Sequence, residues 1–440
     1  MKNLLALAAA LAACSPTFAA SPLADAIQAD YEQHLGALWD HFHRNPELSF
    51  REINTAARMA QELRAIAGVE VTEKVGGTGV VGVLRNGQGP VVLVRADMDG
   101  LPVAERSGLP NASTARQVGV DGVESPVMHA CGHDVHITSL VGTARQLVNL
   151  RSRWRGTVVF IVQPAEERGG GADAMLKDGL YTRFPKPEYA LAFHVAAEMP
   201  TGQVAASEGI QASSADSLDI EVHGVGAHGA APQLGRDPIQ MASEIVVGLQ
   251  SIIGREKGPL ESGVITVGSF HAGSKHNVIP DQANLQLTVR ANSQEVRDQL
   301  LEAIRRFTRG VALAHGMPQN RLPSVKVVEA VPVTVNDAAL ARRLNGALST
   351  ALGKQAVVPF RQTTMAAEDF SFLVQPGLGV KGYYFAVGGA NPAWIEAARN
   401  GGPPIASHHS PLFKVDAGPA VRVGTEAMTA AVLELLRARQ

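Results

Sequence analysis

The stretch Pro90-Val91-Val92-Leu93-Val94-Arg95 decides the fold, because it is short, nearly all apolar and soon followed by two carboxylates, Asp97 and Asp99. Such a run predicts a strand that is buried on both faces of a parallel sheet. Residues 157–162 and 189–193 have the same character, and segments with helical spacing separate these runs. The helical segments are residues 137–150 and 172–180. Alternating strands and helices predict an α/β domain with a mainly parallel sheet.

A different pattern begins near residue 211, where apolar and polar residues alternate as in half-exposed antiparallel strands. The expected elements are strand 217–225, helix 237–253, strands 263–271 and 283–291, helix 293–314 and strand 324–331. This βαββαβ order is that of a ferredoxin-like domain. The first pattern returns from about Asp337. We therefore expect a lid or dimerisation domain, residues 211–331, inserted into a catalytic domain formed by residues 21–210 and 332–440.

The composition favours a globular protein that acts on a small molecule or a peptide. A chain of 440 residues is long enough for about two domains. Charged residues make up 18% of it, below the usual proportion of about 25%, which is typical of well-covered elements and of oligomer surfaces. The formal net charge is −2, so no basic field favours nucleic acid. No transmembrane segment is predicted.

The amino-terminal segment predicts export. Residues 1–20 carry one lysine near the start, a Leu/Ala run and small residues at the end, as a bacterial secretory signal does. Thr17-Phe18-Ala19 offers a cleavage site that would release a periplasmic or secreted enzyme, which is the form we expect. The alternative is a lipoprotein, because Leu11-Ala12-Ala13-Cys14 resembles a lipobox that would leave Cys14 acylated.

Cys131 would be the lone thiol of the exported protein. The only other cysteine, Cys14, would be removed with the signal sequence or acylated, and the compartment outside the cytoplasm is oxidising. His129, His133 and His136 surround Cys131, so we expect a metal ion to occupy this thiol; a buried structural cysteine is the alternative. Cys131 and His133 are two residues apart, and a helix would point them to different sides. We therefore expect both in a loop before the helix that starts at residue 137.

Other polar groups follow the predicted strands. Glu166 and Glu167 come after strand 157–162, and His194 comes after strand 189–193. In open α/β sheets, ligands gather beyond the carboxyl ends of the strands. A Glu-Glu pair is often only a solvated surface, but at this place one carboxylate can bind metal while the other holds a water molecule.

Five segments together resemble the metal-dependent amidohydrolases that include aminoacylases, hippurate hydrolases and auxin-conjugate hydrolases, a family within the dinuclear metallopeptidases. They are Arg95 to Pro102, His129 to His136, Gln163 to Gly171, Phe193 to Val195 and His409 to Phe413. The similarity spans almost all of the mature chain. It implies two divalent metal ions held by Cys131, His133, Glu167, His194 and His409, with His408 as the second choice for the last ligand. Zinc suits this donor set, and manganese, cobalt and nickel are alternatives.

The resemblance also implies roles around the metals. A metal-activated water attacks an amide carbonyl, and Glu166 is the general base that passes its proton to the leaving amine. Asp99 is expected to orient a ligand, and Asp97 either does the same or stabilises a turn. Asp134 and His136 are expected to support ligands, whereas His129 is a candidate packing residue. His43, in Phe42-His43-Arg44-Asn45-Pro46, is expected to be structural.

The inserted domain supplies further candidates. His228 lies in the Gly-rich stretch 224–232 and is either a surface residue or, as in the family, a group that reaches an active site across a homodimer and stabilises the oxyanion. Asn277 and Arg290 resemble positions that hold the substrate carboxylate, although Arg290 could equally be an ordinary strand-end cation. The segment Ala366 to Phe370 matches a family segment near the pocket.

These observations predict an exported amidohydrolase that cleaves N-acyl amino acids. A dipeptidase or carboxypeptidase of the same fold is the first alternative. A binding protein that has lost catalysis is the second, and the intact Glu166 beside a full ligand set argues against it. A cysteine-nucleophile hydrolase is a more distant alternative.

Overall fold

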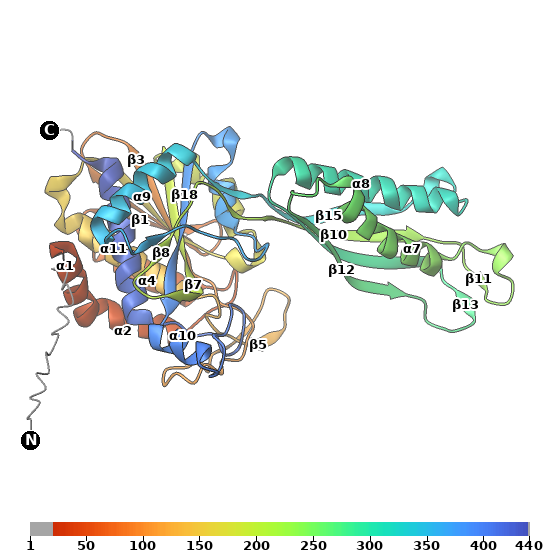
Figure 1. The fold of residues 1–440 in the computed structure, drawn as a ribbon, viewed down its shortest axis with the longest axis horizontal. Coiled ribbons are helices and arrows are strands. Elements are labelled where there is room, and N and C mark those ends of the chain that lie inside the picture. Colours follow the sequence, from red (N-terminus) through yellow and green to blue (C-terminus); the bar gives the residue numbers. More distant parts are fainter. Residues whose placement is uncertain (1–20, 439–440) are drawn as a thin grey trace, which may run out of the picture.

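A computed structural model of the chain describes residues 21–438, which form two bodies (Figure 1). We call residues 21–213 and 332–438 the large body and residues 214–331 the small body. The predicted signal sequence and Cys14 lie outside the described residues. Within residues 21–438, none of the helices has both the length and the apolar character needed to cross a membrane.

The large body is built on an eight-stranded sheet with the order β1-β2-β6-β3-β7-β18-β8-β17. The strands are β1 (Val69–Val75), β2 (Gly79–Asn86), β3 (Val91–Asp97), β6 (Gly156–Gln163), β7 (Tyr189–Pro200), β8 (Val204–Ala205), β17 (Val357–Val358) and β18 (Lys381–Ala390). The four central strands β6, β3, β7 and β18 are parallel. The predicted mainly parallel sheet is therefore confirmed, although the antiparallel hairpin β1–β2 at its edge was not predicted.

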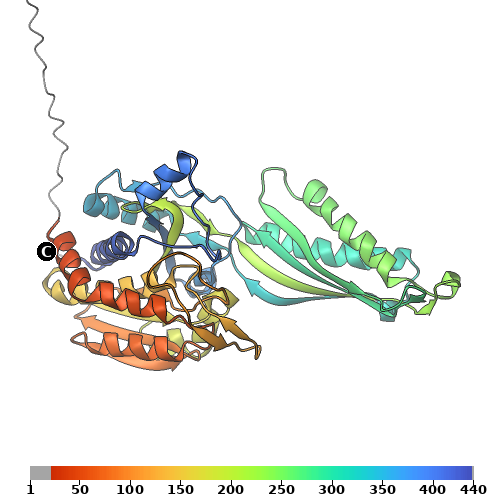
Figure 2. The ribbon, with the colours of Figure 1, turned by 90° about the horizontal axis from the view of Figure 1, so that it is seen from below.

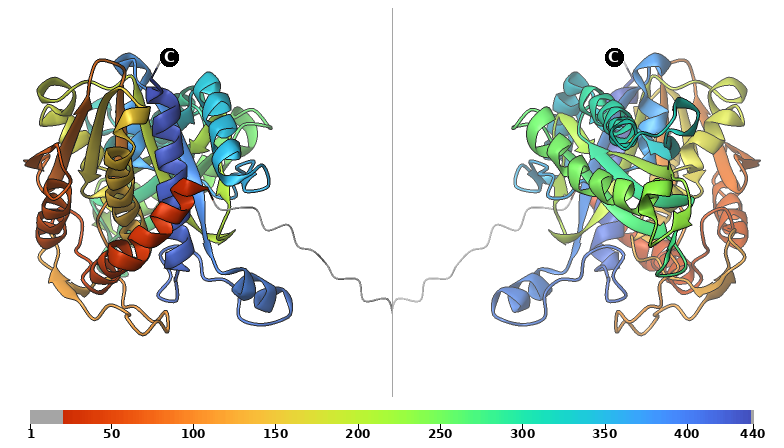
Figure 3. Two further views of the ribbon diagram at one scale, coloured as in Figure 1. Left: turned by 90° about the vertical axis from the view of Figure 1, so that its left-hand side faces the viewer. Right: turned by 90° about the vertical axis from the view of Figure 1, so that its right-hand side faces the viewer.

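Helices cover both faces of this sheet. They are α1 (Pro22–Asp30), α2 (Gly36–Arg44), α3 (Ile53–Arg64), α4 (His133–Asn149), α5 (Gly171–Lys177), α6 (Leu180–Arg183), α9 (Ala338–Leu352), α10 (Pro392–Arg399) and α11 (Ala417–Leu436). α4 and α11 pack side by side on one face (Figure 3).

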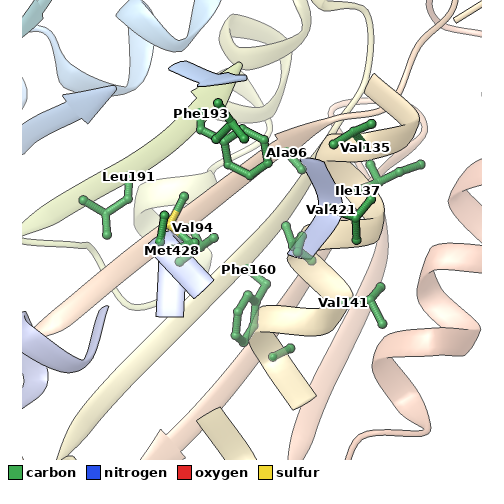
Figure 4. Packing of buried hydrophobic residues seen from close by; sticks show 14 of the residues in the cluster. Val94, Ala96, Val135, Ile137, Val141, Phe160, Leu191, Phe193, Val421 and Met428 are labelled. Carbon is green, nitrogen blue, oxygen red and sulfur yellow. The ribbon is translucent and has the colours of Figure 1, made fainter. Parts of the chain in front are cut away.

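The apolar run of β3 is buried on both faces. Val94 and Ala96 pack toward α4 and α11, where Figure 4 shows them beside Ile137 and Met428. Leu93 belongs to the separate core on the opposite face. Burial on both sides explains why the sequence of this strand shows no alternation of polar and apolar residues.

Two predicted helix boundaries are wrong, and a glycine explains each. α4 starts at His133 rather than at residue 137, because Gly132 adopts a left-handed backbone (φ +83°) and turns the chain directly into the helix. His133 therefore lies on the first turn of a helix and not in a loop, whereas Cys131 does precede the helix. The predicted helix 172–180 is split into α5 and α6 at Gly179 (φ +87°).

The small body has its own antiparallel sheet, with the order β12-β14-β10-β15. Its strands are β10 (Ser214–His223), β12 (Gly263–Ala272), β14 (Gln282–Ala291) and β15 (Ser324–Val331), and its helices are α7 (Pro238–Ser251) and α8 (Gln294–Ala314). Figure 2 shows the two helices along one face of the sheet, where alternate residues of β10 such as Leu218 and Ile220 form the core.

Short paired strands mark the two ends of the small body. β9 (Gly209–Ala212) and β16 (Thr334–Asn336) pair where the chain leaves and re-enters the large body. β11 (Ala227–His228) and β13 (Val278–Ile279) pair at the far tip (Figure 1).

Candidate metal centre

The two glutamates stand on a strained turn that follows β6. Ala165, a non-glycine residue, has a left-handed backbone (φ +50°), and its N–H donates to Glu52 Oε1 at 2.8 Å. The N–H groups of Glu166 and Glu167 donate to the two carboxylate oxygens of Asp99, at 3.1 and 3.0 Å. Asp99 therefore shapes the turn that presents both carboxylates. The side chains of Glu166 and Glu167 are only 11% and 8% exposed, which rules out a solvated surface pair.

Backbone carbonyls orient two of the predicted histidine ligands. His133 Nδ1 lies 2.8 Å from the carbonyl oxygen of Asp99, and His194 Nδ1 lies 2.7 Å from that of Val195. Because a carbonyl only accepts, each Nδ1 carries the proton and each Nε2 keeps its lone pair. His194 Nε2 lies 3.2 Å from Cys131 Sγ. The two imidazoles are thus held in the tautomer that a metal ion needs.

The structure brings His409, rather than His408, to Glu167. His409 has a left-handed backbone (φ +64°), and its N–H donates to the carbonyl of Ala130 at 2.9 Å. Its Nε2 lies 3.3 Å from Glu167 Oε2. The neighbouring His408 turns its Nε2 to the carbonyl oxygen of Val195, at 2.9 Å. His408 is therefore engaged with the backbone, which favours His409 as the ligand.

The five predicted ligands converge, and their atoms fit a metal ion. Cys131, His133 and His194 form one group whose ligand atoms lie within 4.8 Å of one another, and Cys131, Glu167 and His409 form a second. His133 Nε2 and Glu167 Oε1 are 3.8 Å apart, and both are buried without a hydrogen-bond partner among residues 21–438. Buried polar atoms normally have a partner, so two such orphans facing one space indicate an ion there. Thiolate, imidazole and carboxylate form a donor set typical of zinc.

The charge of the cluster also favours cations. Burial raises the pKa of Glu167 to about 7, although nearby His133 acts against the shift. Burial, Glu167 and Glu166 raise the pKa of the Cys131 thiol well above its usual value. These acids are crowded together away from water, and divalent cations would stabilise their ionised forms.

The model of peptidase family M20/M25/M40 matches residues 93–399 of this chain. The chain belongs to this family. It is 38% identical over 339 residues to a hippurate hydrolase from Campylobacter jejuni, a match that covers 76% of this chain and 83% of that relative. It is 36% identical over 354 residues to thermostable carboxypeptidase 2 from Saccharolobus solfataricus, with 79% and 84% covered.

A solved structure shares the architecture of this M20 protein. A dinuclear metal binding peptidase of the M20 family from Bacillus subtilis aligns with a TM-score of 0.73 and 28% identity, covering 94% of this chain and 99% of that one. The predicted family is therefore confirmed, and this M20 protein is a metal-dependent hydrolase of amide or peptide bonds. The candidate ligand groups support two divalent metal ions.

Arg95 is a residue of this M20 site that sequence reasoning missed. Its guanidinium is fully buried and donates to Asp97 Oδ2 at 2.7 Å, Glu368 Oε1 at 2.7 Å and Asp369 Oδ1 at 3.0 Å. Glu368 and Asp369 in turn have carboxylate atoms within 4.8 Å of one on Glu166. Arg95 therefore supplies positive charge behind the metal centre, and the matched segment 366–370 contributes the acids that it balances.

Asp97 and His136 lie beside the metal centre, and their contacts are with the protein. His136 Nδ1 lies 2.5 Å from Asp97 Oδ1, and its Nε2 accepts the Val195 N–H at 2.9 Å. Both ring nitrogens of His136 are thus engaged within the protein. Asp97 Oδ2 lies 3.6 Å from His133 Nε2, so Asp97 borders the metal centre instead of stabilising a remote turn. His129 is buried, as expected for a packing residue.

Two of the three residues predicted on the inserted segment, His228 and Asn277, lie at the tip formed around β11 and β13. His228 is exposed on β11, and its Nδ1 accepts the Ala230 N–H at 3.0 Å. It lines a surface hollow together with Asn277. The strands β11 and β13 on either side of this hollow lie at the far tip of the small body (Figure 1). Arg290 lies near the opposite end of β14, where its Nε donates to Thr288 Oγ1 at 3.1 Å. Within one chain, the structure does not bring His228 or Asn277 to the metals.

Proposed function

We propose that this M20 enzyme hydrolyses the amide bond of N-acyl amino acids, with Glu166 as the general base. The observation that carries the proposal is the placement of Glu166. Its carboxylate shares one group with His133 and Glu167, 4.0 Å from His133 Nε2, while its turn is fixed by Asp99. A carboxylate that lies beside the metal ligands but is not itself a ligand can accept and donate a proton.

The chemistry divides between the metals and the chain. When bound, two divalent ions supply Lewis acidity that lowers the pKa of water and polarises an amide carbonyl. Glu166 accepts the proton of the attacking water and delivers it to the leaving nitrogen. Burial, Glu368 and Glu167 raise the pKa of Glu166 well above its usual value, which helps it to hold that proton between the two steps. Zinc is the ion that we propose.

The similarity to a hippurate hydrolase supports an N-acyl amino acid as the substrate. The similarity to a carboxypeptidase favours peptide hydrolysis as the second candidate. The close grouping of Glu166 with His133 and Glu167 argues against a loss of catalysis.

We further propose that the small body is a ferredoxin-like lid and that a second copy of the chain completes the site. In one chain β11, which carries His228, lies at the far end of the small body (Figure 1). Apolar side chains remain exposed on α7 and on the edge strand β12, including Val247 at 74% and Phe270 at 38%. Such a helix and strand edge suit a homodimer contact, which would let His228 stabilise the oxyanion in its partner. Export to the periplasm is the localisation that we propose.

The test is a substrate panel with the chain from residue 21 onward. Metal-free enzyme is loaded with zinc, manganese, cobalt or nickel and assayed on acetyl-amino acids, hippurate and free dipeptides. We expect the N-acyl amino acids to be cleaved fastest, chelator to abolish turnover and metal to restore it. Faster cleavage of dipeptides would favour the peptidase, and absence of turnover in every metal form would favour the binding protein. Activity that survives exhaustive chelation would support a cysteine nucleophile.

A further inference from the structure

His43 belongs to a buried charge cluster that the proposed chemistry does not use. It lies in the last turn of α2 and stacks on Trp39, with ring centroids 4.8 Å apart. Its Nδ1 lies 2.8 Å from Asp134 Oδ2. Its Nε2 lies 3.3 Å from Glu105 Oε1, close enough for an ion pair although not aligned for a hydrogen bond. One imidazole thus sits between two carboxylates that are themselves almost fully buried.

Asp134 connects this cluster to the first predicted histidine ligand. It directly follows His133 in the first turn of α4, and its Oδ1 accepts the N–H of Val135 at 2.9 Å. The pair with His43 therefore fixes the start of α4 against α2. Since His133 is the first residue of α4, the position of its ring follows from the position of this helix end.

Glu105 connects the cluster to the last predicted ligand. It lies in the loop 101–113, where its carboxylate also accepts a hydrogen bond from Ser107 and the N–H of Ser113. The next residue of the loop, Arg106, donates its N–H to the carbonyl of Pro411 at 2.7 Å. Pro411 is two residues from His409, so the loop braces the segment that carries this histidine.

We propose that His43 is a positioning residue of the metal centre, which ties the start of α4 to the loop 101–113 and thereby holds His133 and His409 in register. The proposal rests on the metal centre assigned above. His43 joins segments that lie far apart in the sequence, on α2, α4 and the loop before residue 411. Residues behind the ligands commonly govern metal affinity without touching the metal.

The charge state of His43 suits its proposed role as a positioning residue. Burial acts against protonation, but Asp134 and Glu105 outweigh it and raise the pKa of His43 to about 10. The imidazolium therefore persists at neutral pH, so the Asp134 hydrogen bond stays charge-assisted and the Glu105 contact stays an ion pair.

The test measures metal affinity directly, without substrate. His43→Gln removes the charge and keeps a polar side chain of similar reach, and zinc Kd is measured by competition with a chelating indicator on metal-free protein. We expect Kd to rise by about 10–100-fold. His41→Gln is the matched control, because His41 lies exposed on the same helix, and its Kd should stay at the wild-type value. At saturating zinc, turnover of the His43 variant should recover to within a few-fold of wild type.

A second variant separates positioning from folding. His43→Gln with Glu105→Gln removes one carboxylate that the single change leaves buried without a counter-charge, and circular dichroism checks that the fold is kept. We expect weakened zinc binding in this folded variant too. A Kd within twofold of wild type in both variants, or an affinity that falls only in proportion to the unfolded fraction, would overturn the proposal. Wild-type protein that binds no divalent metal would overturn the metal centre itself, which is a different outcome.

Discussion

Replacing Arg95 with methionine should severely destabilise the large body. Methionine matches the aliphatic stem of arginine but has no charge and no donors, so the change removes the guanidinium and keeps the packing of the stem. Four acceptor groups lose the Arg95 donor: Asp97, Glu368, Asp369 and the Gln163 side-chain oxygen at 2.9 Å. Three of these are carboxylates that remain buried. The carboxylates keep neutral donors such as Tyr384 on Glu368, but they lose their cation.

The magnitude follows from this burial. Removing one partner of a buried ion pair costs about 3–5 kcal/mol, because the other charge is left without compensation. Here three carboxylates share the cation, which places the expected loss near 5 kcal/mol at neutral pH. Protonation limits this loss of stability. Burial already raises the pKa of Asp369 to about 7 even with Arg95 present, so this acid can take up a proton in the variant.

The loss should depend on pH with a definite sign. Burial would raise the pKa of Asp97, but Arg95 and the nearby histidines hold it well below its usual value. In the wild type, the ionised Asp97 therefore contributes stability above its unfolded pKa of about 4, and this contribution is lost as the pH falls through the lower folded value. Without Arg95 the folded pKa rises. The deficit of the variant should therefore be larger at pH 8 than at pH 5.

The assay is urea unfolding of metal-free protein, followed by tryptophan fluorescence. All three tryptophans of the chain, Trp39, Trp154 and Trp394, lie in the large body, so the signal reports on that body alone. Arg85→Met is the control, because Arg85 pairs with Glu70 on the exposed edge of the sheet and should cost less than about 1 kcal/mol. A loss below about 1 kcal/mol for Arg95→Met, or a deficit that shrinks as the pH rises, would refute the reasoning.

Three further substitutions test the proposed roles. Glu166→Gln should retain both metals and lower turnover by about 10²–10⁴-fold, and an unchanged rate would contradict its role as base. Cys131→Ser should weaken metal binding by more than about 100-fold in a titration while circular dichroism stays at the wild-type spectrum; a lost fold with normal metal affinity would mean a structural cysteine. His228→Ala should lower turnover by about 10²–10³-fold at full metal content. Mixing this variant with Glu166→Gln subunits should restore some activity if His228 acts across a dimer, whereas no recovery would contradict that role.

The central strands could be predicted because both of their faces are buried. Continuous apolar runs such as that of β3 leave little choice of structure. The apolar character of this run gives no separate role to Arg95, its one charged residue. Arg95 and Asp97 are two residues apart and share one face of β3, a spacing that signals a buried ion pair. The hairpin β1–β2 could also be predicted from the sequence, because Gly76-Gly77 separates two strand-like segments.

The choice between neighbouring residues at the site depends on backbone geometry that spacing does not encode. His408 and His409 diverge because His409 has a left-handed φ. His133 opens a helix because Gly132 turns the chain immediately before it. Glu368 and Asp369 reach Arg95 only through the return of the chain after the small body, a long-range contact that no local pattern shows.

Because the chain returns to the large body late in the sequence, the sheet and the predicted ligand set can be completed only late in folding. β18 lies between β7 and β8 in the sheet but follows the whole small body in the sequence, as does His409. In a chain that folds from its amino-terminal end, β7 is therefore left as an open sheet edge until β18 is added, an edge that other chains can pair with. The ligand set closes only when residue 409 of 440 is available. The predicted ligands can therefore surround a metal ion only after β18 has emerged, and β7 presents an open edge until then.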